Sequence, residues 1–302
     1  MAESCKLTIA VVTMNRQKQL IEALESCLKC ELPKKTQFVI IDNASTDDTE
    51  HVATEFLSNC GYAYYYEKMQ SNLGCGGGRN YAFSKANGEY VYVLDDDAVI
   101  SKDNKDFFTR AIRYFEEDDK IVTLTTQIYD TVWKQNRVGS DEKEYKNGLR
   151  FCRMFCGGSH FLRRSFFTEP PYLSNKYGYE ELMPSLFVYD AGKINAFAPD
   201  LLIIHQPAVN KWVYSDKQNQ PLLIDGFAVM YAVKRMMFPR IFIPIIWAIH
   251  KYRCKKHLTG FENASKRGAE VVRDTMQTYK INRRIKTKTV IELVKKFGIS
   301  IF

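Results

Sequence analysis

The feature that most constrains the fold is an alternation of strand and helix patterns over the first hundred residues. Short apolar runs at 7–12, 38–41, 62–66 and 90–94 predict strands. Helical patterns separate these runs at about 15–28, 46–57 and 78–86. Repeated strand–helix units with short connections predict an α/β fold, in which helices flank a mostly parallel sheet on both faces.

A polar segment follows each expected strand. These segments cover residues 13–16, 42–45, 72–79 and 95–97, and the strands before them are apolar. In sheets of this kind, ligands bind beyond the carboxyl ends of the strands. We therefore expect the four segments to meet in one binding site.

Three consecutive aspartates, Asp95, Asp96 and Asp97, follow the fourth expected strand. Adjacent carboxylates repel one another, and a divalent cation at a strand end would neutralise them. Hard oxygen ligands suit Mg2+ or Mn2+. We expect a metal site here, and the alternative is a solvated turn at the start of a helix.

A glycine-rich segment at 72–80 precedes the third expected helix. Glycines let backbone amides approach phosphates, and a helix N-terminus favours anions. Arg79 would add a charge near a diphosphate or a base. A dinucleotide-binding fingerprint fails, because its last glycine would fall on Arg79 or Tyr81. The remaining alternative is a structural glycine turn.

Asp42 directly follows the second expected strand. An exposed aspartate there would accept the imino hydrogen of uracil or thymine. The alternative is a local turn and helix cap made by Ser45 or Asp47.

Two further places carry candidate chemistry. Glu180 and Glu181 lie among apolar and aromatic residues, where one carboxyl of a pair often has a raised pKa and serves as a general base. His205 ends an apolar run. From these residues alone, a solvated helix start and a structural histidine remain the alternatives.

Together these motifs resemble the family 2 inverting glycosyltransferases of the GT-A fold, and within them the bacterial rhamnosyl- and galactofuranosyltransferase-type branch. The resemblance covers residues 6–207. It rests on Val11 to Arg16, Asp42 to Thr49, Asn72 to Asn80 and Leu94 to Asp97, which occur in the family's order and approximate spacing.

The resemblance implies roles for individual residues. Ala191-Gly192 follows the glutamate pair at the family's distance, so the catalytic aspartate of relatives falls on Glu181, and Glu180 stays a candidate. Asp95, Asp97 and His205 would hold Mn2+ or Mg2+, with Asp96 directed toward the ribose or the sugar. The residues that would bind the nucleotide sugar are Thr13, Asn15, Arg16, Asp42, Asn72, Gly74, Arg79, Asp95 and Asp96.

The implied reaction is a single inverting displacement. It would move a sugar from a UDP- or dTDP-linked donor to a hydroxyl of a glycan or a lipid-linked acceptor in surface polysaccharide synthesis. One alternative is a sugar-1-phosphate nucleotidyltransferase, which would need a glycine-rich loop directly after the first strand. The other is a non-catalytic, membrane-associated scaffold, which loss of the carboxylates would favour. Here Thr13 to Arg16 contains no glycine, and the carboxylates are present.

The expected organisation has two parts. Residues 1–210 form the catalytic domain, with a nucleotide-sugar half at 1–100 and an acceptor half at 101–210, and residues 211–302 form a helical, basic region. No acidic residue lies between Asp225 and Glu262, whereas basic residues are frequent there, so an anionic partner is expected. We expect this region to contact an anionic membrane surface, with packing on the catalytic domain or a homo-oligomer contact as alternatives. A nucleic-acid partner is not expected, because it leaves the aspartates unexplained.

The apolar residues expected to face the membrane are interleaved with Lys234, Arg235 and Arg240. They are Phe227, Met230, Tyr231, Met237, Phe238, Ile241 to Ile243 and Ile245 to Trp247. Pro239 and Pro244 predict two short helices rather than one. The longest apolar run, 241–249, is too short to span a bilayer.

The start of the sequence lacks the pattern of a signal peptide. The eight cysteines lack paired zinc-ligand spacing and are expected to be reduced. A cytoplasmic location is therefore expected, with peripheral contact at the inner face of the cell membrane.

Overall fold

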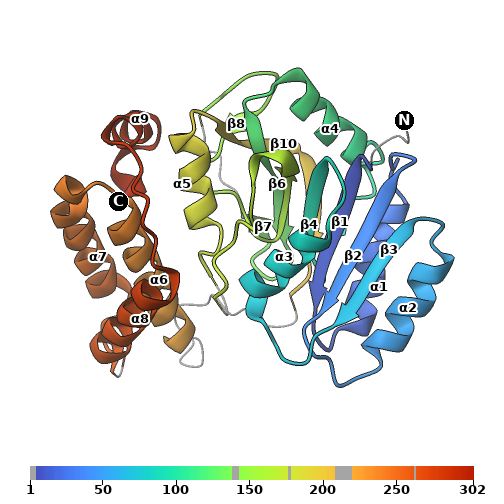
Figure 1. Ribbon diagram of the computed structural model, residues 1–302, viewed down its shortest axis with the longest axis horizontal. Coiled ribbons are helices and arrows are strands. Elements are labelled where there is room, and N and C mark those ends of the chain that lie inside the picture. Colours follow the sequence, from blue (N-terminus) through green and yellow to red (C-terminus); the bar gives the residue numbers. More distant parts are fainter. Residues whose placement is uncertain (1–4, 138–142, 176–177, 208–219, 262) are drawn as a thin grey trace.

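The structure, a computed structural model, describes residues 5–137, 143–175, 178–207, 220–261 and 263–302. Its centre is a ten-stranded sheet with the strand order β3-β2-β1-β4-β9-β6-β10-β5, to which β7 and β8 add short pairings with β6 and β10 (Figure 1). The strands are β1 (Leu7–Thr13), β2 (Thr36–Asp42), β3 (Ala63–Lys68), β4 (Tyr90–Asp95), β5 (Ala98–Ile100), β6 (Ile121–Asp130), β7 (Gln135–Asn136), β8 (Arg150–Phe151), β9 (Ser159–Arg163) and β10 (Ile194–His205).

The α/β fold and the sheet flanked by helices are confirmed. Strands β1 to β4 pair in parallel, as the sequence predicts, and the structure adds that β1 lies between β2 and β4. Beyond β4 the sheet becomes mixed, because β9 runs antiparallel to both β4 and β6. This brings the ends of β4, β6 and β10 to one edge of the sheet.

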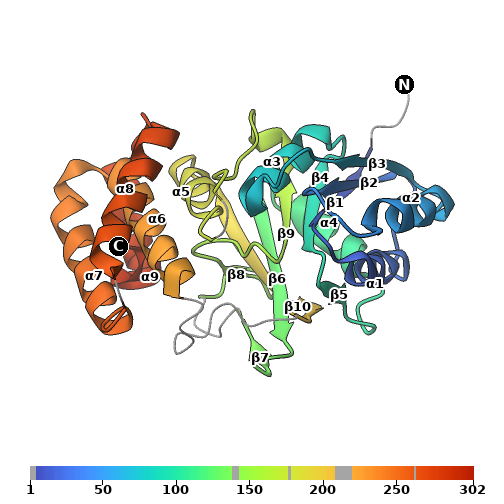
Figure 2. The same cartoon turned by 90° about the horizontal axis from the view of Figure 1, so that it is seen from below.

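Helices cover both faces of the sheet. They are α1 (Gln17–Leu28), α2 (Thr49–Asn59), α3 (Gly74–Lys85), α4 (Phe107–Glu117) and α5 (Leu182–Asp190). Alternate residues of β1 point to opposite faces: Leu7, Ile9 and Val11 pack with α1 and α4, whereas Ala10 packs with α3. Figure 2 shows α3 and α1 on opposite sides of the sheet.

Two expected elements differ from the structure. The third helix begins at Gly74 rather than at about Gly78, so most of the expected glycine loop is helical. The apolar runs at 194–199 and 201–204 predict two short strands, but the structure has one strand, β10, with a register shift between Ala198 and Leu202. This register shift interrupts the apolar pattern, which explains why the sequence predicts two strands. All eight cysteines lie in described parts of the chain and are unbridged, as expected.

The C-terminal helices are α6 (Gln220–Met237), α7 (Ile243–His257), α8 (Ala264–Tyr279) and α9 (Thr287–Phe297). They pack together at one end of the molecule, beside α5 (Figure 1). The break between α6 and α7 confirms the two helices predicted from the prolines, and a short 3-10 turn, Arg240–Phe242, lies between them. The segment around residue 210, where the two expected domains meet, lies outside the described residues.

The apolar cluster of the C-terminal helices extends into the catalytic half, since it includes Leu173, Leu182 and Leu186. Asp190, the last residue of α5, is buried and accepts hydrogen bonds from Lys286 N (2.7 Å), Thr289 Oγ1 (2.8 Å) and Arg283 Nη2 (3.1 Å). Helix α5 therefore packs with the C-terminal helices as well as with the catalytic half.

The expected membrane face is only partly exposed. Phe227, Met230, Met237 and Phe238 are buried within the C-terminal cluster, so this part of the expectation is wrong. Lys234 is also buried, and its Nζ donates to the backbone oxygen of Phe302 at 2.9 Å. None of the described helices combines the length and the apolar character needed to cross a membrane.

Candidate functional site

The segments after β1 and β4 join at the predicted edge of the sheet. Thr13 Oγ1 donates to Asp96 Oδ2 at 2.7 Å. Arg16 Nη1 donates to Asp96 Oδ1 at 2.8 Å and to Asp97 Oδ2 at 2.7 Å. Burial is the main cause that raises the pKa of Asp96, to about 6, although the Arg16 charge opposes it. The end of β1 and the segment after it thus supply the groups that hold the aspartate turn.

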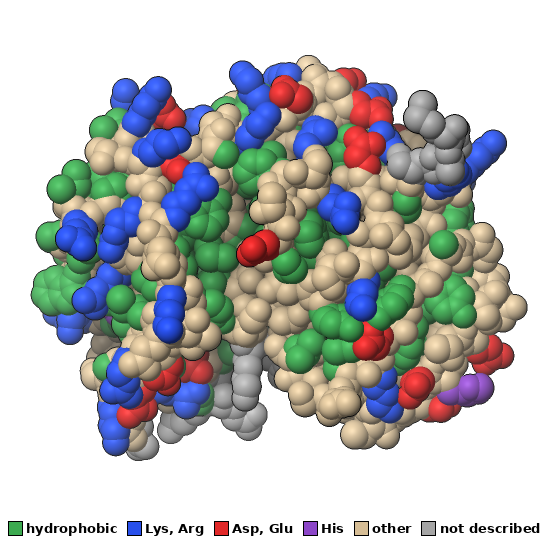
Figure 3. Space-filling model, in the orientation of Figure 1, with side chains coloured by type: hydrophobic (Ala, Val, Ile, Leu, Met, Phe, Trp, Pro, Cys, Tyr) green, Lys and Arg blue, Asp and Glu red, His purple; other side chains and the backbone are tan. Residues whose placement is uncertain are grey.

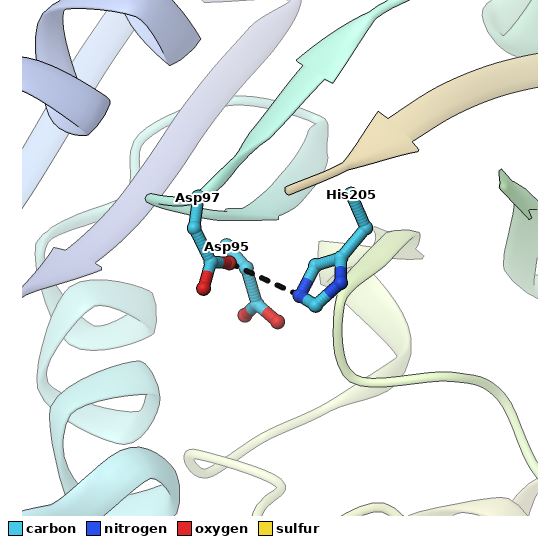
Figure 4. Close-up of side chains that lie close together, drawn as sticks. All are labelled: Asp95, Asp97 and His205. Carbon is cyan, nitrogen blue, oxygen red and sulfur yellow. Dashed lines mark ion pairs between the residues drawn. The ribbon is translucent and has the colours of Figure 1, made fainter. Parts of the chain in front are cut away.

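Asp95, Asp97 and His205 form the one group of potential metal ligands found among the described residues, with ligand atoms within 4.8 Å of one another. They come from the end of β4, the turn after it and the end of β10. Figure 4 shows the imidazole and the carboxylate of Asp97 turned toward each other, and His205 Nε2 lies 3.1 Å from Asp97 Oδ1. The predicted metal ligands are therefore brought together.

A second group of residues orients the histidine. Asp130 Oδ2 lies 3.2 Å from His205 Nδ1, and Arg137 Nη2 lies 3.0 Å from the same nitrogen. Burial disfavours the charged imidazole, but the contact with Asp97 raises the pKa of His205 above its ordinary value. A carboxylate behind a ligating histidine is a common device for fixing its ring. Asp130 and Arg137 were not identified from the sequence.

The donor set fits a divalent cation. Two carboxylates and one imidazole converge at the end of the sheet, and Asp95 is still partly exposed, with 30% of its side chain accessible. Carboxylate ligands suit Mg2+ and Mn2+, and an imidazole also suits the transition metal. These three residues would hold the ion.

Arg79 has a different place from the one expected. It is 4% exposed, and its guanidinium donates to Asp95 Oδ1 (2.7 Å), Glu180 Oε1 (2.9 Å) and Glu181 Oε1 (2.8 Å). The expectation that Arg79 faces the diphosphate or the base does not fit these contacts, because a buried guanidinium takes carboxylates as partners. Arg79 instead joins the aspartate turn to the glutamate pair.

The two glutamates lie just before α5 and are both buried. Burial, followed by the charge of Glu180, raises the pKa of Glu181 to about 8, and Arg79 opposes this rise. Glu180 Oε2 has no hydrogen-bond partner among the described residues. A solvated helix start, the alternative for this pair, is wrong because both side chains lie inside the protein.

Two glycines before β9 permit these contacts. A Cβ on Gly157 would lie 2.1 Å from Glu181 Oε1 and 2.6 Å from Arg79 Nη1, and one on Gly158 would lie 3.2 Å from Asp95 Oδ2. Gly158 O also accepts from Asp95 N at 3.0 Å. The sequence shows a small-residue loop here, but its neighbours are known only from the fold.

Asp42 is fully buried, so the exposed aspartate expected at this strand end is not found. Its Oδ1 accepts from Ser45 N at 2.7 Å and its Oδ2 from Tyr66 Oη at 2.8 Å. A local turn is present, as in the alternative, but its acceptor is Asp42 rather than Ser45 or Asp47; Asp47 Oδ1 accepts from Thr49 N at 3.2 Å where α2 begins. Asn15 is exposed beside this turn, and its Oδ1 accepts from Thr46 N at 2.7 Å.

The glycine run of α3 serves close packing. A Cβ on Gly76 would lie 1.8 Å from Leu173 O, and one on Gly78 would lie 2.6 Å from Val12 Cγ1. Asn72 is exposed at the start of the helix, where its Oδ1 accepts from Gly74 N at 2.7 Å. Contact of Asn72 and Gly74 with a nucleotide stays a prediction, as it does for Thr13, Asn15, Arg16, Asp95 and Asp96.

The sequence matches the model of a protein family described as Glycosyl transferase family 2 over residues 8–169. The poly(ribitol-phosphate) beta-N-acetylglucosaminyltransferase TarS of Staphylococcus aureus is 33% identical over 122 residues, which are 39% of this chain and 20% of the relative. The GalNAc(5)-diNAcBac-PP-undecaprenol beta-1,3-glucosyltransferase of Campylobacter jejuni is 32% identical over 92 residues, 30% of this chain and 29% of the relative. The chain thus matches less than a third of the length of either relative.

Solved structures share the fold. S. aureus TarS 1–349 in complex with UDP-GlcNAc superposes with a TM-score of 0.60 at 16% identity and covers 98% of this chain and 89% of its own. The mannosyltransferase PcManGT of Pyrobaculum calidifontis, in complex with GDP-Man and Mn2+, has a TM-score of 0.59 at 15% identity and covers 100% of this chain and 82% of its own. The rhamnosyl- and galactofuranosyltransferase-type branch stays a prediction.

Proposed function

The chain belongs to glycosyl transferase family 2, and on that premise we propose that it moves a sugar from a nucleoside diphosphate sugar to an acceptor hydroxyl with inversion at the anomeric carbon. The observation that carries the proposal is the buried bridge from Asp95 through Arg79 to Glu181, with distances of 2.7 and 2.8 Å. It links a proposed metal ligand to a carboxyl whose pKa is raised. The bridge thereby holds Asp95, which would bind the metal ion of the sugar donor, and Glu181, the proposed proton acceptor, in a fixed arrangement.

Glu181 acts as the general base in this proposal. It takes the proton of the acceptor hydroxyl while that oxygen attacks the anomeric carbon, and the bond from this carbon to the diphosphate oxygen breaks. A pKa of about 8 suits proton transfer near neutral pH. Glu181 is favoured over Glu180 because its Oε1 lies beside the Gly157–Gly158 loop, which also contacts Asp95.

Asp95, Asp97 and His205 would hold Mn2+ or Mg2+. When bound, the cation supplies positive charge that stabilises the leaving diphosphate. Arg16 and Thr13 orient Asp96 toward the ribose or the sugar of the donor, and Arg79 positions Glu181. Asn15, Asn72, Gly74 and the turn held by Asp42 lie along the same edge and contribute to the nucleotide site.

UDP is the nucleotide we propose first, with dTDP second, because TarS is seen with UDP-GlcNAc. The acceptor is a glycan or a lipid-linked glycan of the cell surface. This is consistent with the poly(ribitol-phosphate) and undecaprenol-linked substrates in the names of the two relatives. A lipid-linked acceptor would require the enzyme to work at a membrane.

The test begins with a screen of UDP-, dTDP- and GDP-sugars by thermal shift with and without Mn2+, followed by detection of the released diphosphate. Glu181→Gln should keep the Mn2+-dependent shift with the donor but lose about a hundredfold or more of the transfer rate. Asp97→Ala should lose the Mn2+ response and the activity while it stays folded.

The exposed Glu169→Gln serves as the matched control, since it removes a carboxylate away from the site and should keep transfer within a few-fold. Glu180→Gln decides which of the two glutamates is the base. An inactive Glu180→Gln beside a normal Glu181→Gln would move the base by one residue. Full turnover in excess chelator would contradict the metal site. Release of pyrophosphate from a nucleoside triphosphate and a sugar phosphate would instead indicate the nucleotidyltransferase.

A further inference from the structure

Helices α6, α7 and α8 enclose a groove of about 860 Å³. Its walls are largely apolar and include Phe227, Tyr231, Trp247, Leu258 and Met276. Small residues of α8 leave the space open: a Cβ on Gly268 would reach nothing closer than Ile224 at 3.8 Å. The proposed sugar transfer uses none of these residues.

The rim of the groove carries positive charge. Arg235, Lys251, Lys255 and Arg273 are among the residues that line it, and no Asp or Glu is among the described lining residues. Lys251 Nζ lies 5.7 Å from the centre of the Trp247 ring. An apolar interior with a cationic rim is complementary to a molecule with a hydrocarbon chain and an anionic head.

The outer side of α7 and the turn before it add exposed apolar side chains next to the groove. Ile241 is 71% exposed, Ile245 39%, Trp247 52% and Tyr252 64%. Ile245 and Tyr252 are seven residues apart and so lie on one stripe of the helix. Figure 3 shows hydrophobic side chains interleaved with Lys and Arg over this end of the molecule. Large apolar side chains gathered in this way mark a contact surface.

We propose that this surface binds an anionic phospholipid bilayer. Ile241, Ile245 and Tyr252 enter the interface, one lipid chain occupies the groove, and the headgroup phosphates pair with Lys251, Lys255 and Arg273. This arrangement, with an apolar stripe beside cations, is the one by which amphipathic helices lie on membranes. It also places the exposed part of the predicted membrane contact on α7, while Phe227 and Tyr231 of α6 line the groove and Met237 and Phe238 stay inside the protein.

Charge argues against a second copy of the chain as the occupant. In a symmetric dimer the same patch faces itself, so the basic rim would oppose another basic rim. A bilayer with anionic headgroups instead neutralises these cations. The proposal is independent of the sugar transfer, because binding is measured with no donor or acceptor present.

The experiment is sedimentation of the full chain with vesicles of phosphatidylglycerol and phosphatidylcholine, compared with vesicles of phosphatidylcholine alone. A truncation before α6 is unsuitable, because it would expose Leu182 and Leu186. We expect binding to the anionic vesicles and weak binding to the neutral ones. The double variant Lys251→Gln/Lys255→Gln should bind on the order of tenfold less, and added salt should weaken the wild type.

A matched control removes two exposed lysines at the two ends of α1, with Lys18→Gln/Lys29→Gln, and should bind like the wild type. Ala269→Trp fills the groove without a change in charge and should lower binding severalfold. Trp247→Ala gives a second test of the apolar part if Ala269→Trp misfolds. Equal binding to neutral vesicles, or an equal loss in the α1 control, would overturn the proposal. So would a dimer in solution that Tyr252→Ser dissociates while no vesicle binding occurs.

Discussion

A single buried side chain, Arg79, links the two sides of the candidate site. Its three carboxylate partners come from β4 and from the segment before α5, about a hundred residues later in the chain. A guanidinium can bond several carboxylates because its donors are fixed in a plane, whereas a lysine cannot reproduce that pattern. Arg79 therefore holds Glu181 at a set distance from Asp95, and we infer that it positions the base rather than the donor.

The raised pKa of Glu181 predicts how the rate of sugar transfer depends on pH. Burial and the Glu180 charge raise this pKa to about 8, and only the ionised carboxylate can accept the acceptor proton. With limiting substrates, kcat/KM should therefore rise with pH, reach half of its limit near pH 8 and level off above it. Glu180→Gln removes the neighbouring charge, so it should shift the rise toward lower pH.

A pH–rate profile of the wild type and of Glu180→Gln, each at saturating Mn2+, measures both effects. Lys18→Gln, on an exposed part of α1, is the control whose profile should not move. A profile that is flat from pH 6 to 9, or a shift of the Glu180→Gln profile toward higher pH, would contradict the assignment.

The place of a site residue could be predicted from the sequence where the residues next to it in the chain determine that place. Asp95 and Asp97 follow a buried strand and His205 ends another, so their convergence follows from the rule for strand ends. The partners of Arg79, by contrast, depend on a contact across the fold, which no local pattern encodes. The same is true of Asp130 and Arg137 behind the histidine, and of the burial of Asp42.

At the scale of elements, the loop before β9 has one structural requirement. It must pass between the aspartate turn and the glutamate pair, and only a residue without a Cβ fits there. A Cβ on Gly157 would lie 2.1 Å from Glu181 Oε1. Both Glu181 and Arg79 are buried, so neither can move without breaking the bridge.

Gly157→Ala should therefore lower kcat on the order of a hundredfold, because a shift of about 1 Å in a catalytic group has effects of that size. Its thermal unfolding should remain cooperative. Gly268→Ala is the matched control: it adds the same methyl where the nearest atom would be 3.8 Å away, and it should keep full activity. Steady-state kinetics and thermal unfolding check both variants. Normal turnover by Gly157→Ala would contradict the requirement for a close contact between Gly157 and the side chains of Glu181 and Arg79.

The elements themselves were predictable to different degrees. Buried parallel strands such as β1 and β2 appear as continuous apolar runs, and the turns between units are short, so they are found from the sequence. The start of α3 was misplaced because its glycines resemble a loop, whereas they are selected for packing against Leu173 and Val12. The register shift in β10 divided one strand into two apparent ones.

At the scale of the whole molecule, α5 connects the candidate site to the C-terminal helices. Glu181 precedes its first turn, and Asp190 at its other end bonds to the segment that leads into α9. Leu182 and Leu186 lie in the apolar cluster of the C-terminal helices. The C-terminal region therefore packs against the helix that begins just after Glu181, the proposed base.

This coupling was not predictable from composition. The basic, apolar pattern after residue 220 is typical of a membrane-facing helix, and the same pattern also serves a helix that packs on its own chain. In the structure these residues differ by helix as well as by face: Phe227 and Met237 of α6 are buried against protein, whereas Ile245 and Tyr252 of α7 are exposed. Periodicity alone does not say which side of a helix meets protein.

Asp190→Ala tests the coupling. Burial disfavours the Asp190 carboxylate, but bonds from Lys286 N, Thr289 and Arg283 lower its pKa below the ordinary value of 3.8. The Asp190 carboxylate therefore stabilises the fold above the ordinary pKa of 3.8, and this stabilisation is lost as the pH falls through the lowered pKa of the folded protein. Loss of these bonds at pH 7 should cost on the order of 3 kcal/mol of unfolding free energy. Because α5 would be released, kcat should also fall, with little change in the affinity for the donor.

Urea unfolding and steady-state kinetics at pH 7 measure both effects. Asp274→Ala on α8 is the matched control, since its carboxylate is exposed and makes only a surface ion pair at 3.7 Å with Arg273. A variant that loses stability but keeps full kcat would separate the C-terminal helices from catalysis. An unchanged unfolding midpoint would show that Asp190 does not hold them. If both quantities fall together in Asp190→Ala and neither falls in Asp274→Ala, the base of the candidate site depends on packing at the far end of α5.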